Sequence, residues 1–278
     1  MRQSAYVPRI TRLLARLARA SHPEPTVAVT ALAAALAGSV GASPIRVGAA
    51  FLSGQLSVGW SNDWLDARRD VAVGRTDKPV VQGLEVQTVR TAALLAATAC
   101  LPLSLLLGTA AGLAHLVAVA LAWLYNARLK ATVASFLPYA VSFGLVPSIV
   151  TLSLPGHPWA PWWASGAGAL LGVGAHGANV LPDLEDDLQT GVRGLPHRLG
   201  RRLTTVLSGL ALVAATVLLA VGPGTTVAGA LAVATAVVVF AVGLAQGRRP
   251  GSRAPFLSVI VVAAVDVGLL LLRGASLT

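Results

Sequence analysis

The chain is poor in charge and nearly free of cysteine. Charged residues make up 12% of its 278 residues, against about 25% in a soluble globular domain. This scarcity excludes an ordinary soluble protein, a disordered tail and a fibrous array. Cys100 is the single cysteine, which excludes an internal disulfide framework and a cysteine-based metal site. The sequence is instead 55% hydrophobic, with a mean hydropathy of +0.73, as in an integral membrane protein.

Nine stretches are long and apolar enough to cross a bilayer, whose hydrocarbon core needs about 20 residues per helix. They are continuously apolar and lack the two-residue alternation of barrel strands. We therefore predict an all-α membrane bundle of nine transmembrane helices, formed as one domain by residues 26–278 and preceded by a basic arm, residues 1–25. The predicted spans are residues 26–43, 45–61, 84–107, 109–125, 133–154, 159–181, 203–221, 224–246 and 255–272.

Positive charge gathers on one side of this predicted bundle. The net charge of +10 would suggest nucleic acid in a soluble protein, but most of the Lys and Arg residues fall in the arm and in alternate loops. The positive-inside rule makes that side cytoplasmic. We thus expect a multi-pass protein of the plasma (inner) membrane with a cytoplasmic N-terminus and no nucleic-acid partner.

The arm also resembles the start of a secretory signal, but the alternation of charge favours its retention. Its arginines and leucines are typical of a helix lying on an anionic membrane surface. A solvated tail that only sets orientation is the alternative.

Eight of the eleven acidic residues lie in two short segments on the predicted cytoplasmic side. In the first segment, a helix would carry Asn62, Asp63, Asp66 and Asp70 on one face, because residues three and four apart are neighbours on a helix. Asn179, Asp183 and Asp187 repeat the four-residue spacing at the end of the sixth predicted span.

Two such carboxylate stripes repel within themselves and need a cation. Hard oxygen ligands without His or Cys suit Mg²⁺, which takes one or two carboxylates together with phosphate oxygens. We interpret the pair as a site for a diphosphate bridged by magnesium, with basic side chains on the remaining oxygens. Two solvated loops that neutralise nearby arginines are the simpler alternative.

The motifs resemble those of the UbiA superfamily of intramembrane prenyltransferases. Asn62, Asp63, Asp66 and Asp70 match its NDxxDxxxD motif, and residues 75–79 match an R-T-x-[RK]-P segment. Residues 179–191 match its second motif, an Asn followed by DxxxD and a Gly, and YNARLK at 125–130 matches a Y-x(3–4)-L-K element.

The resemblance implies a nine-helix bundle around a central cavity, in which Mg²⁺ holds an isoprenyl diphosphate between the two motifs. The allylic carbon–oxygen bond would ionise and an acceptor, most often an aromatic ring, would capture the cation. It implies catalytic roles for Asp63, Asp66, Asp183 and Asp187. It implies metal binding by these four and Asp70, and diphosphate binding by Asn62, Lys78, Tyr125, Lys130 and Asn179. Apart from the resemblance, Arg68, Arg69, Arg75 and Arg128 offer further cations for the diphosphate oxygens.

The chain departs from the family pattern in two places. The second motif is crowded, so that Asp186 or Asp187 is its second carboxylate, and the spacing favours Asp187. The segment after it reads Val-Arg-Gly-Leu-Pro, without the threonine of many relatives, which concerns substrate subclass more than chemistry.

Three other functions are weighed against the transferase. A terpene cyclase of the same fold would ionise the same diphosphate without an acceptor. A transporter would need ionisable groups near the bilayer midplane, whereas these cluster at helix ends. The signature of the CDP-alcohol phosphotransferases is missing from the sequence.

The sequence leaves some roles open. The intramembrane Asp266 would orient an acceptor, pair with Arg46 or Arg90, or be a protonated hydrogen-bonding group. Arg90 could reach the diphosphate, and His176 could line the cavity. The acceptor, the length of the donor chain and the oligomeric state are not encoded in any motif.

Overall fold

The computed structural model describes residues 9–72, 74–76, 78–247 and 252–277, and every regular element in these ranges is helical. The predicted all-α class is confirmed. The α-helices are α1 (Arg9–Ala20), α2 (Pro23–Ser39), α3 (Pro44–Ala72), α4 (Val86–Leu105), α5 (Thr109–Ala127), α6 (Leu137–Thr151), α7 (Trp162–Val180), α8 (Leu184–Gln189), α9 (Leu195–Val221), α10 (Val227–Gln246) and α11 (Ala254–Leu272). Short 3₁₀ helices η1 (Leu129–Ala131), η2 (Leu181–Asp183) and η3 (Gly274–Ser276) complete the elements.

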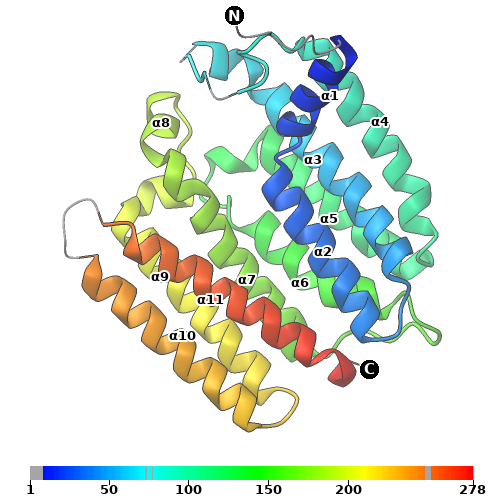
Figure 1. Ribbon diagram of the computed structural model, residues 1–278, viewed down its shortest axis with the longest axis vertical. Coiled ribbons are helices and arrows are strands. Elements are labelled where there is room, and N and C mark those ends of the chain that lie inside the picture. The colour runs from blue at the N-terminus through cyan, green and yellow to red at the C-terminus, as the bar shows by residue number, and fades with distance from the viewer. Residues whose placement is uncertain (1–8, 73, 77, 248–251, 278) are drawn as a thin grey trace, which may run out of the picture.

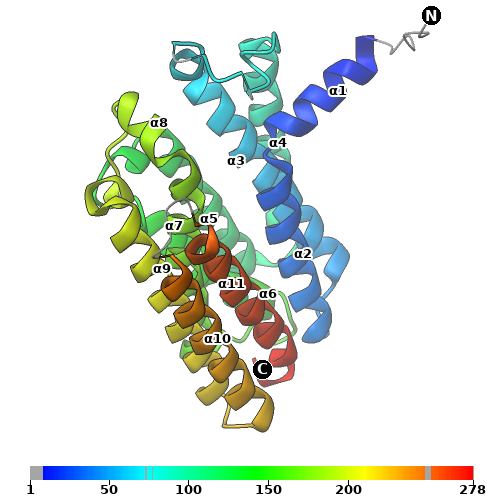
Figure 2. The same ribbon diagram turned by 60° about the vertical axis from the view of Figure 1, so that its left-hand side comes forward.

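The long helices form a bundle in which most helices that are consecutive in the sequence also contact each other (Figure 1). α11 contacts α2, so the end of the chain returns to its beginning. In Figure 2, α1 and α8 lie at the same end of the bundle. That end also receives the C-terminal part of α3, and both acidic segments therefore meet there.

Each of the nine predicted spans overlaps one of the helices α2–α7 and α9–α11. This overlap does not establish that all nine helices cross the membrane. Within the described residues, five helices are long and apolar enough to cross a membrane by length and composition, namely α4, α5, α9, α10 and α11. α2 and α6 have only 17 and 15 residues, at or below the lower limit of about 17 for a spanning helix. The chain is a multi-pass membrane protein, and nine crossings remain a prediction.

Local sequence sets where several helices begin and break. Pro occupies the first turn of α2, α6, α9 and α11, where its missing N–H costs no hydrogen bond. Gly200 has φ +76° inside α9, a conformation that glycine adopts without strain. The continuous apolar run of α9 starts at residue 203, shortly after this break.

Apolar side chains fill the bundle and also cover much of its outside. A core of small and branched residues joins α2, α3, α5, α6, α7, α9 and α11. Leu95, Leu210, Val227 and Leu231 are among the apolar side chains that stay more than half exposed. An exposed apolar surface of this extent marks contact with lipid.

The basic arm is helical over Arg9–Ala20 and docks at its C-terminal end. Trp60 donates an indole hydrogen bond of 2.8 Å to the carbonyl oxygen of Leu17. Ala20 is buried in a cluster with Ala67 and Val89. The C-terminal end of the arm is thus packed on the bundle, whereas Ile10, Leu13 and Leu14 are exposed.

Asp266 lies in the bundle between α11 and α9, apart from the acidic segments. It is fully buried, and its Oδ1 accepts a hydrogen bond of 2.6 Å from Thr216 Oγ1. Arg90 stacks its guanidinium over the ring of Trp64 at 5.3 Å. Of the three roles considered for Asp266, the hydrogen-bonded one fits this environment.

Close approach of α6 and α7 depends on glycine. A Cβ at Gly172 would overlap the carbonyl oxygen of Tyr139, whereas a Cβ at Gly268 would meet nothing within 4 Å. We predict that Gly172→Ala lowers the free energy of unfolding by about 1–3 kcal/mol, because added volume in a packed interface forces the backbone to move. Thermal unfolding in detergent measures this effect.

Gly268→Ala is the matched control in another helix. We expect no loss of stability there, because alanine favours the helix by up to about 1 kcal/mol. Equal melting temperatures for the two variants would contradict the proposed packing role of Gly172.

Candidate active site

The C-terminal third of α3 brings the first acidic motif to a cavity of about 290 Å³. α3 is one continuous helix to Ala72, and it therefore extends beyond the predicted span, residues 45–61. Asn62, Asp66 and Asp70 line the cavity, as expected for positions four apart on one helix face. The predicted geometry of this motif is confirmed for these three side chains.

The second motif reaches the same cavity by a different backbone path. Asn179, Asp183 and Asp187 all line it, but they do not lie on one helix as their spacing suggested. α7 ends at Val180, η2 follows, and Asp187 belongs to the separate helix α8. Pro182 accounts for the break, because proline has no N–H to continue the helical hydrogen bonds.

Basic side chains tie the two motifs together across the cavity. Arg69 Nη2 lies 2.9 Å from Asp66 Oδ2 and 4.0 Å from Asp187 Oδ1. Arg75 Nη2 lies 3.5 Å from Asp183 Oδ1. One arginine thus bridges α3 to α8, and a second joins the loop after α3 to η2.

Asp63 lies beside the cavity and is held by two partners. Its Oδ1 is 2.8 Å from His22 Nε2 and 3.0 Å from Lys78 Nζ, and its side chain is 1% exposed. Burial raises the pKa of Asp63, but the hydrogen bond with His22 and the charge of Lys78 outweigh it, so that the pKa falls below its usual value. Asp63 therefore stays ionised, and its buried Oδ2 has no hydrogen-bond partner among the described residues.

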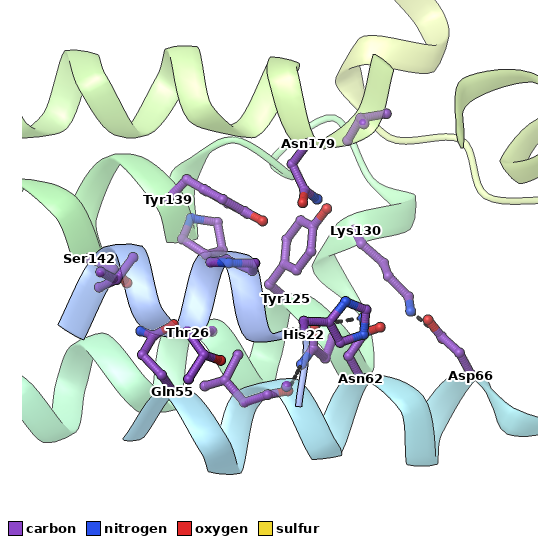
Figure 3. Close-up of a pocket in the computed structure, with 18 of the residues that line it drawn as sticks. His22, Thr26, Gln55, Asn62, Asp66, Tyr125, Lys130, Tyr139, Ser142 and Asn179 are labelled. Carbon is purple, nitrogen blue, oxygen red and sulfur yellow. Dashed lines mark hydrogen bonds and ion pairs between the residues drawn. The ribbon is translucent and has the colours of Figure 1, made fainter. Parts of the chain in front are cut away.

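Lys130 follows α5 in η1 and pairs with Asp66, as Figure 3 shows. Burial lowers the pKa of the Lys130 ammonium, while the charge and hydrogen bond of Asp66 oppose that effect. Burial, reinforced by the nearby charge of Asp66, raises the pKa of the Asp70 carboxyl. The cluster is thus an array of coupled charges at the mouth of a low-dielectric cavity.

Neutral groups brace the charged ones. Asn62 Nδ2 donates to Asn126 Oδ1 at 3.2 Å. Asn126 Nδ2 in turn donates to the Val58 carbonyl and to Ser61 Oγ at 2.9 and 2.8 Å. His197 Nε2 lies 3.2 Å from Asp187 Oδ2, so α9 contributes to the site through this histidine.

Tyr125 and Tyr139 pack edge to face, with ring centroids 5.2 Å apart, and both line the cavity. His176 lies behind them, with its centroid 5.1 Å from that of Tyr139 and its Nε2 3.0 Å from Ser135 Oγ. His176 therefore supports this aromatic wall and is not among the lining residues.

Most of the residues predicted from the sequence line the cavity. The exceptions are Asp63, which lies beside it, and two arginines. Arg68 and Arg128 are exposed, and neither is among the residues that line the cavity. Their predicted contact with a diphosphate has no support in this geometry, and Arg69 and Arg75 take the corresponding positions.

Sequence reasoning assigned no specific role to His22, Asn126 or His197. His22 is 41 positions from Asp63, Asn126 lies inside the YNARLK element, and His197 follows Asp187 by ten residues. Arg69, one of the candidate cations, lines the cavity because it follows Asp66 by three residues and shares its helix face.

The donor set suits a hard divalent cation that is shared with a ligand. The described residues contain no group of three or more His, Cys, Asp or Glu side chains arranged to hold a metal by themselves. Mg²⁺ often takes only one or two carboxylates and completes its octahedron with water and phosphate oxygens. The carboxylates of Asp66 and Asp187, which both line the cavity, fit that mode.

The buried contact of Lys78 with Asp63 should be important for stability. Lys78→Met leaves a buried carboxylate without its cation, and we predict a loss of about 3 kcal/mol in the free energy of unfolding. Combining it with Asp63→Asn should recover part of that loss in a double-mutant cycle. Breaking the exposed pair Arg201–Glu185 with Glu185→Gln should cost less than about 1 kcal/mol, and a similar loss in both cases would contradict the assignment.

Comparison with known proteins identifies the fold. The structure is similar to that of a UbiA homologue from Archaeoglobus fulgidus bound to GPP and Mg²⁺, with a TM-score of 0.70 and 17% identity over 94% of this chain and 99% of that chain. It is also similar to the apo structure of a UbiA homologue from Aeropyrum pernix K1, with a TM-score of 0.66 and 19% identity over 96% of this chain and 99% of that one. A search of the curated proteins found no match.

A third similar structure is an Archaeoglobus fulgidus UbiA homologue bound to Cd²⁺, with a TM-score of 0.65 and 16% identity over 94% of this chain and 99% of that chain. At such identities these likenesses show a shared fold. The family assignment rests on sequence, since the model of the UbiA prenyltransferase family matches residues 25–263. Because this match covers most of the chain, the protein belongs to the UbiA prenyltransferase family.

Proposed function

We propose that this protein transfers a prenyl group from an isoprenyl diphosphate to an aromatic acceptor, in a reaction that depends on Mg²⁺. The observation that carries the proposal is the meeting of the two acidic motifs in one cavity that also holds Arg69, Arg75, Lys78 and Lys130. Two similar structures are UbiA homologues bound to GPP or DMAPP together with Mg²⁺. These complexes support the same donor class here.

Asp63, Asp66, Asp70, Asp183 and Asp187 are the proposed Mg²⁺ ligands. Bound Mg²⁺ would neutralise the negative charge that grows on the departing diphosphate. The protein itself supplies Lys78 and Lys130 for the remaining oxygens, as point charges at 14% exposure each. Asn62, Asn179 and Tyr125 are proposed to orient the diphosphate by hydrogen bonds, since all three line the cavity.

The apolar part of the cavity has a role in the chemistry. Its apolar lining includes Phe51, Val119, Phe143 and Val146. Such walls exclude water, which would otherwise capture the allylic cation formed when the carbon–oxygen bond breaks. The faces of Tyr125 and Tyr139 add the negative side of an aromatic quadrupole next to that cation.

The proposed topology follows the distribution of charge. Nine membrane crossings by α2–α7 and α9–α11 would leave the N-terminus and both motifs on the cytoplasmic side of the inner membrane. The basic arm, residues 1–25, would lie along the anionic leaflet, and residues 26–278 would form the catalytic domain. Substrate diphosphate would then enter from the cytoplasm and its apolar chain from the bilayer.

The neighbouring pair Asp186 and Asp187 offers a sharp test. Asp187 lines the cavity, whereas Asp186 is exposed outside it. We predict that Asp187→Asn lowers Mg²⁺-dependent diphosphate release at least about a hundredfold, while Asp186→Asn stays within about twofold of the wild type. Colorimetric diphosphate release in nanodiscs, with allylic donors of several chain lengths, measures both.

Equal losses in the two variants would show that the charge of the segment matters and the cavity position does not. Wild-type protein that binds Mg²⁺ but releases diphosphate from no donor would refute the proposed activity.

Dependence on an acceptor separates transfer from cyclisation. We expect diphosphate release to rise at least about tenfold when a suitable aromatic acceptor is added, with a prenylated acceptor as the product by mass spectrometry. Full release without any acceptor, together with a cyclic hydrocarbon product, would identify a terpene cyclase instead.

A further inference from the structure

The cavity has a second polar region, separate from the charged motifs. Gln55, His115 and Ser142 line it among apolar side chains. In Figure 3, Gln55 and Ser142 lie at the end away from the Lys130–Asp66 pair, with Tyr125 and Tyr139 between the two ends. The prenyl chain of a donor has no polar group to match these side chains.

Helix geometry sets the separation of the two regions. Gln55 precedes Asn62 by seven residues on α3, which is two turns along the same face, or about 10 Å. His115 precedes Asn126 by eleven residues on α5, or about 16 Å along the helix axis. A molecule that touches the second region therefore extends well away from the diphosphate.

His115 lines the cavity, and only one of its two ring nitrogens has a hydrogen-bond partner among the described residues. Its Nδ1 lies 2.7 Å from Ser104 Oγ, and the Ser104 hydroxyl donates at 2.6 Å to the carbonyl oxygen of Cys100. We assign the single Ser104 hydrogen to that carbonyl, which places the imidazole proton on Nδ1 and leaves Nε2 with a free lone pair. His115 is 2% exposed, and Nε2 faces Gly54, where it would lie 3.2 Å from an added Cβ.

The neighbours of His115 are neutral hydrogen-bonding groups. The Gln55 amide has no hydrogen bond within the described part of the chain, and it offers both donors and an acceptor. Ser142 Oγ donates 3.0 Å to the Ala118 carbonyl, which leaves its lone pairs available. The wall beside them is aromatic, since the Phe51 ring packs on His115 with centroids 4.6 Å apart.

Charge is confined to the other end of the cavity. The Arg and Lys side chains that line it, Arg69, Arg75, Lys78 and Lys130, come from the end of α3, the loop after it and η1. A carboxylate beside His115 and Gln55 would be buried without a cation, which is costly in an apolar setting. A neutral hydroxyl would instead find an acceptor nitrogen and an amide.

From this arrangement we infer that Gln55, His115 and Ser142 form a subsite for a neutral hydroxyl group on an aromatic acceptor, and that the enzyme discriminates against aromatic acids. The inference deepens the proposed transferase function and rests on it. The acceptor hydroxyl would donate to His115 Nε2 and accept from the Gln55 amide. Ser142 would accept any second donor of the ligand.

Binding of three naphthalenes tests the subsite without catalysis. The probes are 1-naphthol, 1-methoxynaphthalene and 1-naphthoate, which share one ring system and differ in the polar group. Equilibrium dialysis against the full chain in nanodiscs at pH 7, without Mg²⁺ and donor, gives each Kd after uptake by protein-free nanodiscs is subtracted. We expect 1-naphthol to bind about tenfold more tightly than either analogue, the value of one buried hydrogen bond.

Two variants remove the partners separately. Gln55→Leu and His115→Phe should each raise the Kd of 1-naphthol about tenfold and leave that of 1-methoxynaphthalene within about twofold. Thr98→Val is the matched control, because Thr98 is an exposed side chain of α4 whose hydroxyl bonds only its own helix. It should bind all three probes as the wild type does.

Several results would overturn the subsite. They are tighter or equal binding of 1-naphthoate, an unchanged Kd for 1-naphthol in both variants, and no measurable binding of 1-naphthol. These readings need neither donor nor metal, and diphosphate release is measured separately. Failure of the subsite is therefore distinct from failure of the transferase.

Discussion

The structure depends on balancing five carboxylates at one end of an apolar bundle. Asp63, Asp66 and Asp70 are each at most 8% exposed, and the facing segment adds Asp183 and Asp187. Burying carboxylates of like charge is tolerated only where cations or hydrogen bonds compensate for lost hydration. Arg69, Arg75, Lys78 and Lys130 provide that balance, each from a position in the chain just after an apolar helix or at its end.

The same balance holds the elements in register. Arg69 bridges α3 and α8, Lys130 joins η1 to α3, and Arg75 joins the loop after α3 to η2. Helices that pack through small residues and apolar contacts have little else to fix their ends. The ion pairs thus define which helix ends meet, while the core fixes how closely the helices pack.

These pairs also suit a site that must accept an anionic ligand with its cations. A buried pair that is satisfied within the protein alone would compete with substrate. Here Asp63 keeps one oxygen unpartnered, and the 4.0 Å contact of Arg69 with Asp187 is long for a direct hydrogen bond. Such loosely satisfied groups can exchange one partner for a metal or phosphate oxygen without leaving a bare charge.

The sequence predicts the class of the fold and much of the site for a clear reason. Membrane helices must satisfy their backbone internally, so continuous apolar runs translate directly into helices. Four-residue spacing then predicts a shared face wherever the helix continues, as it does for Asn62, Asp66 and Asp70. The same rule fails at Pro182, where one predicted stripe is divided among α7, η2 and α8 although its side chains still converge.

Residues brought in by tertiary structure could not be predicted in this way. His22 precedes Asp63 by 41 positions, and His197 follows Asp187 by ten across a turn. Their roles depend on how α1, α2 and α9 dock, which local spacing does not encode. Among the candidate arginines, the helical repeat favours Arg69 over Arg68, because Arg69 lies three residues after Asp66 and shares its helix face.

Division of the cavity into a charged end and a neutral polar end follows from the membrane itself. Charges are stable near the aqueous ends of the helices, where long side chains reach water, and costly at greater depth. Neutral groups such as the Gln55 amide and the His115 imidazole can lie deeper if they find partners. In the proposed subsite, His115 has one partner in Ser104 and its other ring nitrogen has none among the described residues, so the depth of the site favours recognition of hydroxyl groups over acids.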